Sequence, residues 1–453
     1  MSSNSLRDRD LAYTLHPYTN LRLHEEKGPL VLMRGQGVKV WDDAGREYIE
    51  AMAGLWCTAL GFSEPRLIEA AKRQMEALPF AHQFGHKAHE PGIELAEKLI
   101  GMAPAGLTKA LFANSGSESN DTAIKLVWYY NNALGRPEKK KIIARRRAYH
   151  GVTVAAASLT ALTANQRDFD LPIDRILHTD CPHAYHEALP GEDDEAFSTR
   201  LADNLEKLIL AEGPETVAAF FAEPVMGAGG VVVPPAGYFP KIMAVCRKYD
   251  VLMLADEVIC GFFRTGQAWG SQTLDYQPDM LTCAKALSSA YLPISALLVS
   301  DKVYQVVADN SAKIGTFGHG YTYSAHPVAA AVALETLKIY EERDIGAHVR
   351  SIAPCMQAHL ARLSQHSLVG EARGLGLIGA LELVEDKASR KNFDPARGIG
   401  GKVVAAMERH GVIGRAMMND SLAFSPPLII TTAELDELFA RTEAALDEVA
   451  ATL

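Results

Sequence analysis

The stretch Val-Leu-Met-Leu-Ala-Asp-Glu, residues 251–257, has five apolar positions and then two acids. Four more short apolar runs occupy residues 110–113, 142–144, 217–222 and 280–284, with helical patterns between them, such as 119–134. Short runs without polar alternation are typical of strands buried on both faces, as in a parallel sheet covered by helices. We therefore predict an α/β fold built on a large, mostly parallel sheet.

The pattern changes after residue 326, where helical segments are expected over 328–343 and 345–365 and shorter mixed elements follow. At about 150 residues per domain, a chain of 453 residues has room for two large domains or three smaller ones. We predict a large α/β domain over 56–325. A smaller α+β domain is expected to combine 1–55 with 326–453.

Composition limits the classes of partner. The 45 basic and 55 acidic residues give a net charge of −10, which speaks against nucleic-acid binding and against a basic membrane-surface protein. No signal peptide or membrane span is visible, and the six cysteines lack C-x-x-C spacing. We expect a cytoplasmic protein with reduced thiols.

Polar groups follow the apolar runs, at the strand ends where open parallel sheets bind ligands. They are Asn114-Ser115-Gly116-Ser117, Tyr149-His150-Gly151, Glu223, Asp256-Glu257 and Lys285. Each has an ordinary explanation: the serines could be a helix N-cap, Asp256 a solvated strand-end acid, and Lys285 a lysine reaching the surface. Together, a phosphate-type loop, an aromatic ring, a carboxylate and a lysine are what pyridoxal 5'-phosphate requires.

The sequence resembles the class III aminotransferases, pyridoxal-phosphate enzymes of fold type I, the aspartate-aminotransferase fold. The resemblance covers nearly the whole chain. It is carried by LFANSGSESNDTAIKL, YHG, EPVMGAGG, LMLADEVICGFFRTG, PDMLTCAKAL and HGYTYSAHPVA in that order. It implies a transaminase that alternates between pyridoxal and pyridoxamine phosphate in a ping-pong reaction.

The resemblance also implies a role for individual residues. Lys285 would form the Schiff base and move the proton, and Asp256 would pair with the pyridine nitrogen. The remaining cofactor residues would be Ser115, Gly116 and Ser117 at the phosphate, Tyr149 and Val258 on the ring faces, and His150 and Glu223 around them. Thr322 would reach the phosphate in the neighbouring subunit of a homodimer with shared active sites, or of a tetramer.

Three positions indicate which branch of the family the sequence resembles. Relatives acting on ornithine, acetylornithine or 4-aminobutyrate usually carry arginine at the position of Ala423 and often glutamate at that of Ala228. Here Arg415 stands where the amine:pyruvate branch places its carboxylate-binding arginine. The resemblance thus implies an ω-transaminase with Trp56, Phe84, Tyr149 and Arg415 around a small-molecule amine donor and a keto-acid acceptor. Ala290 replaces a glycine common in relatives, which leaves the chemistry intact.

Alternatives to transamination remain on the same fold: decarboxylation, amino-group migration by an aminomutase, or a non-catalytic binding protein. Two histidine groups could also suggest a metal. They are His82, His86 and His89, and Cys181, His183 and His186. Because Gly85 and Pro182 interrupt the two sets, neither offers a regular helical ligand face, and no metal is expected.

Overall fold

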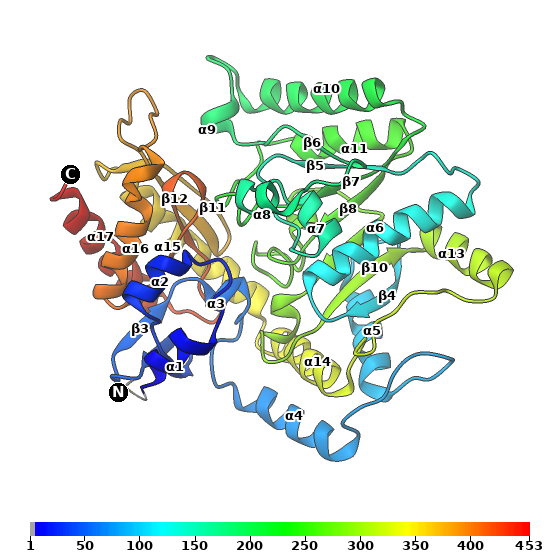
Figure 1. The fold of residues 1–453 in the computed structure, drawn as a ribbon, viewed down its shortest axis with the longest axis horizontal. Helices are drawn as coiled ribbons and strands as arrows, with labels where there is room; N and C mark the ends of the chain where they lie inside the picture. Colours follow the sequence, from blue (N-terminus) through cyan, green and yellow to red (C-terminus); the bar gives the residue numbers. More distant parts are fainter. Residues whose placement is uncertain (1–4) are drawn as a thin grey trace.

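A seven-stranded sheet forms the centre of the molecule in a computed structural model that describes residues 5–453 (Figure 1). Its strands, in spatial order, are β4 (Leu107–Ala113), β10 (Ser295–Ser300), β9 (Met280–Cys283), β8 (Leu252–Asp256), β7 (Val217–Ala222), β5 (Lys141–Arg145) and β6 (Ile176–Thr179). Only β10 runs against its neighbours β4 and β9, and the other strand pairs are parallel. The mostly parallel sheet is therefore confirmed.

Both faces of this sheet are buried, which explains the unbroken apolar runs. Phe220 of β7 lies in the cluster that also holds residues of α10 (Asp194–Glu212) and α11 (Tyr238–Lys248). Its neighbour Phe221 lies in a second cluster with residues of α6 (Gly116–Ala133) and α13 (Asp301–Ile314). Successive side chains of a strand point to opposite faces, so both must be apolar when helices cover both.

Two smaller sheets form the rest of the architecture. The first has the order β1 (Leu32–Gln36), β2 (Lys39–Asp42), β3 (Glu47–Glu50) and β13 (Val412–Ile413). The second has the order β11 (Val369–Leu375), β12 (Ile378–Leu383), β15 (Ser421–Phe424) and β14 (Arg415–Ala416). The parallel pairing of β3 with β13 joins the N-terminal segment to the C-terminal third. The domain boundaries at 56 and 326 stay a prediction.

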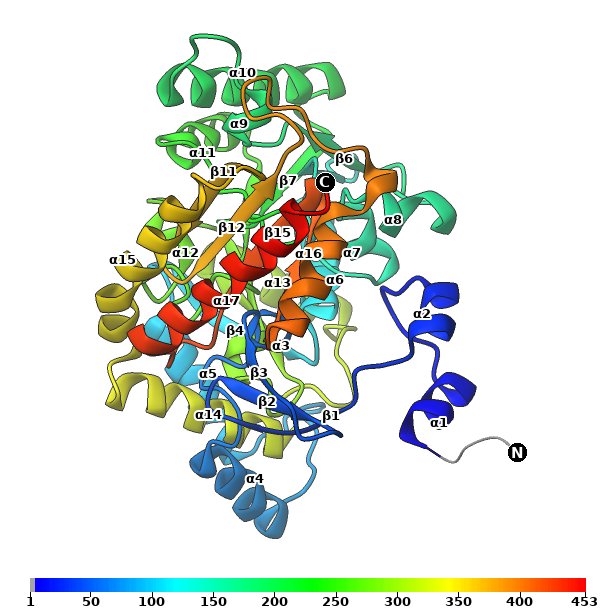
Figure 2. The ribbon, with the colours of Figure 1, turned by 90° about the vertical axis from the view of Figure 1, so that its left-hand side faces the viewer.

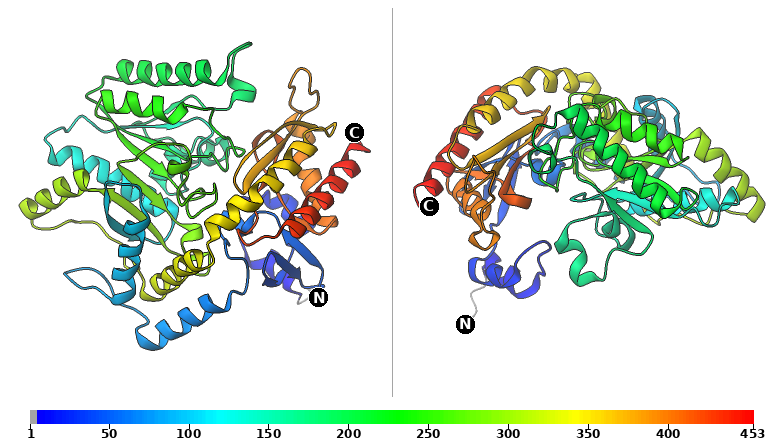
Figure 3. Two further views of the ribbon diagram at one scale, coloured as in Figure 1. Left: turned by 180° about the vertical axis from the view of Figure 1, so that it is seen from behind. Right: turned by 90° about the horizontal axis from the view of Figure 1, so that it is seen from above.

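Long helices line the C-terminal part of the chain. They are α14 (Pro327–Glu342), α15 (Ile345–Leu363), α16 (Ile399–Arg409) and α17 (Thr432–Ala450). Figure 3 shows α15, α16 and α17 beside the small sheets, while α14 packs against α4 (Pro65–Ala77) and α5 (Glu90–Met102). The expected helices over 328–343 and 345–365 are confirmed to within two residues at each end.

The remaining elements are short. The helices are α1 (Leu6–Tyr13), α2 (Leu21–Lys27), α3 (Ala53–Trp56), α7 (Val154–Leu159), α8 (Thr163–Gln166), α9 (Ala184–Glu187) and α12 (Gly270–Thr273). The 3-10 turns are η1 (Arg167–Phe169), η2 (Lys285–Ser288), η3 (Pro395–Arg397) and η4 (Met418–Asp420). Figure 2 shows α1 and α2 standing apart at the side of the molecule. None of the described helices is long and apolar enough to cross a bilayer.

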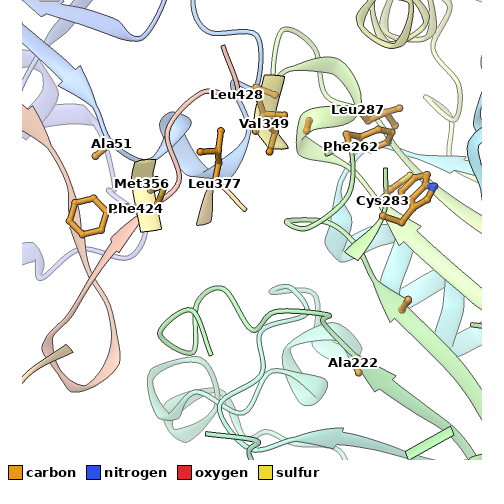
Figure 4. Packing of buried hydrophobic residues seen from close by; sticks show 14 of the residues in the cluster. Ala51, Ala222, Phe262, Cys283, Leu287, Val349, Met356, Leu377, Phe424 and Leu428 are labelled. Carbon is orange, nitrogen blue, oxygen red and sulfur yellow. The ribbon is translucent and has the colours of Figure 1, made fainter. Parts of the chain in front are cut away.

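One apolar cluster extends across the two parts of the chain. Leu377 lies in the turn between β11 and β12 and Phe424 lies in β15, whereas Phe262 and Leu287 lie close to the central sheet (Figure 4). Because this shared core reaches η2, the position of Lys285 at its start is fixed by packing from both sides.

Candidate active site

A cavity of about 360 Å³ opens at the carboxyl ends of the central strands. It contains every predicted cofactor residue except Thr322: Ser115, Gly116, Ser117, Tyr149, His150, Glu223, Asp256, Val258 and Lys285. Its volume lies within the range of about 300–1,000 Å³ that is usual for small-molecule sites.

The first turn of α6 forms one wall of the cavity. Ser115 is the N-cap, and its Oγ accepts a hydrogen bond from the Glu118 amide at 3.2 Å. The following amides, of Gly116 and Ser117, are among the N–H groups that a helix leaves without an internal partner. With the helix dipole, they form an anion site of the kind that binds phosphate.

Close packing against this turn requires glycine at 116 and 151. A Cβ on Gly116 would lie 3.0 Å from Cγ2 of Val258, and one on Gly151 would lie 2.5 Å from Oγ of Ser117. That hydroxyl accepts a hydrogen bond from the Val152 amide at 3.1 Å. The loop after β5 therefore lies directly on the α6 terminus.

Asp256 is almost fully buried at the end of β8 and is held by three donors. Its Oδ2 lies 2.7 Å from His150 Nδ1 and accepts from Asn120 Nδ2 at 2.8 Å, and its Oδ1 accepts from the Val258 amide at 3.1 Å. These three contacts fix the orientation of the carboxyl group at the base of the cavity.

Lys285 is the first residue of the turn η2, which follows β9, and has a left-handed backbone conformation with φ of 51°. Burial lowers the pKa of its amine, opposed by the nearby charge of Asp256. Its Nζ makes no hydrogen bond or ion pair with any of residues 5–453. A desolvated amine without a partner is suited to act as a nucleophile and a base.

Glu223 lines the cavity and hydrogen-bonds to two backbone amides. Its two carboxylate oxygens accept hydrogen bonds from the amides of Tyr149 and Gly227, each at 3.0 Å. Burial raises the pKa of this fully enclosed acid. Glu223 therefore positions the Tyr149 backbone.

A second, larger cavity of about 740 Å³ adjoins the first and shares Tyr149, Ile259 and Lys285 with it. Trp56, Arg415 and Met417 line its walls, as do Tyr18 and Asn165. The guanidinium of Arg415 has no carboxylate partner within residues 5–453. Its nearest aromatic neighbour is Tyr18, whose ring centre lies 6.0 Å from Cζ.

Phe84 and Thr322 lie away from both cavities of their own chain. Phe84 is 48% exposed, and its ring would lie 2.6 Å from a Cβ on Gly320, two residues before Thr322. The structure thus places Phe84 beside the segment that carries Thr322, and both residues are exposed. Their role there stays a prediction.

Two residues of the site were missed from the sequence. Asn120 lies one turn after Ser117 on the same face of α6, so that spacing could have indicated it. Tyr18 is far from every motif, and its position in the substrate cavity depends on tertiary structure alone. Burial and a hydrogen bond with Tyr18 raise the pKa of Tyr149.

Three of the histidines considered from the sequence, His89, His183 and His186, make structural contacts. His89 is the N-cap of α5 and accepts from the Gly92 amide at 3.1 Å. His183 pairs with Glu371 at 2.9 Å, and His186 pairs with Glu382. Arg373 bonds to both of these acids, so the group forms a charge network between α9 and the second small sheet.

The cavity fits pyridoxal phosphate on the chain's own geometry. An anion site, a cavity with a buried carboxylate at its base and a lysine without a bonding partner among residues 5–453 occur together. In the same part of the chain, His150 Nε2 and Asn120 Oδ1 are buried and have no hydrogen-bond partner. Fold and site together define a fold type I pyridoxal-phosphate enzyme.

Comparison with known proteins gives the family. The aminotransferase class-III family model matches residues 23–446. "Gamma aminobutyrate transaminase 1, mitochondrial" of Solanum lycopersicum is 53% identical over 425 residues, 94% of this chain and 82% of that protein. The chain belongs to the class III aminotransferases, which use pyridoxal phosphate.

Solved structures of ω-transaminases are also similar. The enzyme from Pseudomonas jessenii in complex with PMP has a TM-score of 0.97 and 55% identity, covering 98% of both chains. A thermostable ω-transaminase variant engineered for asymmetric synthesis of enantiopure bulky amines has the same score and identity, covering 98% of this chain and 99% of that one. In that variant a tryptophan, a phenylalanine and an arginine are replaced.

Proposed function

We propose that this transaminase moves an amino group from a primary amine or ω-amino acid to pyruvate or a similar keto acid. The observation that carries the proposal is Arg415, whose guanidinium lines the cavity that contains Lys285 and Tyr149 and has no carboxylate partner in the described part of the chain. An arginine in such a position binds a substrate carboxylate bidentately. Pyruvate brings that carboxylate.

The engineered ω-transaminase supports the same assignment. Its three replaced residues are of the same types as Trp56, Phe84 and Arg415, with the same separations along the sequence. Exchanges at those positions were made for bulky amines, so the corresponding side chains here are expected to limit the size of the donor.

The curated relatives favour 4-aminobutyrate as one candidate donor. Several at 50–53% identity are named gamma-aminobutyrate transaminases. This acid carries both an ω-amino group and a carboxylate that Arg415 could bind, although Ala423 and Ala228 depart from the residues common in that branch. A carboxylate-free amine and 4-aminobutyrate are therefore the two donors to compare.

Bound pyridoxal phosphate supplies the electron sink for breaking the bond at the amine-bearing carbon. The chain's residues do the rest. Asp256 would keep the ring nitrogen of the cofactor protonated, and Tyr149 would cover its ring. Lys285 would carry the proton between the amine-bearing carbon of the substrate and the cofactor. Arg415 would orient the acid, and Trp56 would restrict the space in the same cavity.

The test separates the two half-reactions of the enzyme. Arg415→Ala should raise the KM for pyruvate strongly, with a loss of about 2–4 kcal/mol, because a desolvated carboxylate loses its partner. Amination of the cofactor by an aryl-alkyl amine in a single turnover should change much less. Amination by 4-aminobutyrate should fall with the pyruvate reaction.

Arg415→Lys is the matched control, since it keeps the charge and loses the bidentate geometry. It should lie between wild type and Arg415→Ala. Equal losses with both donors, or none with pyruvate, would contradict the assignment. Steady turnover without any keto acid would favour decarboxylation or an aminomutase instead.

We also propose a homodimer with shared active sites, located in the cytoplasm. Phe84, Thr322 and Tyr323 are exposed and do not line either cavity of their own chain, and two exposed aromatic rings support an interface with a second subunit. The curated plant relatives are described as mitochondrial or chloroplastic, so cell fractionation with a detectable fusion is the test of location.

A further inference from the structure

Three potential metal ligands meet where α1 and α2 lie against each other. Nε2 of His16 lies 2.8 Å from Oδ2 of Asp10, and Nε2 of His24 lies 3.2 Å from the same oxygen. One ligand atom from each residue falls within 4.8 Å of the others. The two imidazole rings are 4.0 Å apart.

We propose that Asp10, His16 and His24 bind a divalent transition-metal ion of the zinc class, which fastens α1 to α2. Two imidazoles and a carboxylate, with an open position for water, are a common ligand set for zinc. Tetrahedral ligands at about 2.0–2.1 Å from zinc lie roughly 3.3 Å from one another. The observed separations need only a small expansion to admit the ion.

The charge around the group favours a cation. No lysine or arginine bonds to Asp10 within residues 5–453, and its recorded side-chain partners are the two histidines and Thr14. By contrast, the His183, His186 and Glu382 group already contains the guanidinium of Arg373.

An ion at this site would stabilise the packing of α1 against α2. Neither α1 nor α2 has a buried residue, so the pair of helices lacks an apolar core of its own. The turn between them carries Pro17 and Tyr18 into the substrate cavity. Tyr18 also accepts a hydrogen bond from Asn165 at 2.5 Å. An ion that holds α1 and α2 together would therefore restrict the motion of Pro17 and Tyr18 in the wall of the substrate cavity.

Zinc titration by calorimetry tests the site on untagged holoenzyme freed of metal with a chelator. One ion should bind the wild type, and both His16→Asn and His24→Asn should weaken its affinity at least about tenfold. His410→Asn is the matched control, because His410 forms a pair with Glu448 at 2.9 Å but belongs to no group of three possible metal ligands among the described residues. It should bind zinc as the wild type does.

Hydrogen exchange supplies the second measurement, and neither measurement depends on the transamination reaction. Zinc should slow amide exchange over residues 6–27 in the wild type and not in His24→Asn. No binding, or equal binding by wild type and the histidine variants, would overturn the metal site. Unchanged exchange in zinc-bound wild type would overturn the fastening of α1 to α2.

Discussion

Lys285 combines two properties that belong to the single residue: its amine is desolvated, and it has no bonding partner within residues 5–453. Lys285→Ala should lower transamination by at least about 10³-fold, because no other group at that place can carry the proton. The phosphate site at α6 is separate, so the protein should still retain cofactor after gel filtration. Lys285→Arg is the matched control: it keeps a cation that cannot deprotonate and should be equally inactive. Substantial steady-state turnover by either variant contradicts the role.

Asp256 differs from Lys285 in acting through its charge. Asp256→Asn keeps a similar shape and the contact with Asn120. It loses the negative charge that would keep the ring nitrogen of the cofactor protonated. The rate of the amine half-reaction should fall much further than the affinity for pyridoxal phosphate. Stopped-flow absorbance gives the first quantity and equilibrium dialysis the second. A half-reaction rate near that of the wild type would remove Asp256 from the mechanism.

At the scale of elements, the loop after β5 rests on the first turn of α6 through Gly151, whose φ is 130°. In Gly151→Ala the new Cβ would meet Oγ and Cα of Ser117 at 2.5 and 2.8 Å. The helix terminus must shift, and the phosphate site should lose about 1–3 kcal/mol of binding. Gly135→Ala is the control, since its φ is also positive and nothing lies within 4 Å of the added atom. Equal cofactor affinity in both variants would contradict this account.

The turn that carries Trp56 depends on Glu50, at the end of β3. Its carboxylate accepts hydrogen bonds from the Met52 and Gly54 amides, and burial raises its pKa to about 8. Above about pH 4.5 the Glu50 carboxyl therefore stays protonated in the folded chain, whereas it loses its proton in the unfolded chain. As a result, Glu50 lowers the free energy of unfolding as the pH rises from about 4.5 towards 8.

Glu50→Gln should remove that cost, because the amide does not ionise. Its Tm should fall less than that of the wild type between about pH 5 and about pH 8. Glu76→Gln, on an exposed position of α4, should follow the wild type. Parallel curves for Glu50→Gln and wild type would show that Glu50 does not titrate in this window.

At the scale of the whole molecule, the shared site predicts complementation between two inactive variants. Lys285→Ala removes the amine of its own chain's site, while Thr322→Asp should place a negative charge beside the neighbour's phosphate. In a symmetric dimer, each mixed pair has one site with neither change. Refolding the two variants together should restore about a quarter of wild-type activity. Either variant refolded alone is the control, and no gain on mixing would mean that Thr322 does not cross the interface.

The sequence by itself determined the central sheet and most of the cofactor site. Strands buried on both faces must be apolar throughout, so 217–222 could be identified without a partner strand, and β7 has those bounds. Polar groups at the strand ends gave Ser115, Tyr149, Asp256 and Lys285 because parallel strands end at one edge. The strands β6 and β10 were not predicted from the sequence. Only the structure shows that β10 runs antiparallel to its neighbours.

Only the tertiary structure decided which distant residues join the site. Tyr18 reaches the substrate cavity from a turn between two exposed helices, and His16 and His24 meet Asp10 at the other side of that turn. Asn120 lies within a motif, yet its bond to Asp256 depends on how α6 packs on β8. Local patterns record burial and backbone preference, whereas contacts between remote segments depend on packing that no local pattern contains.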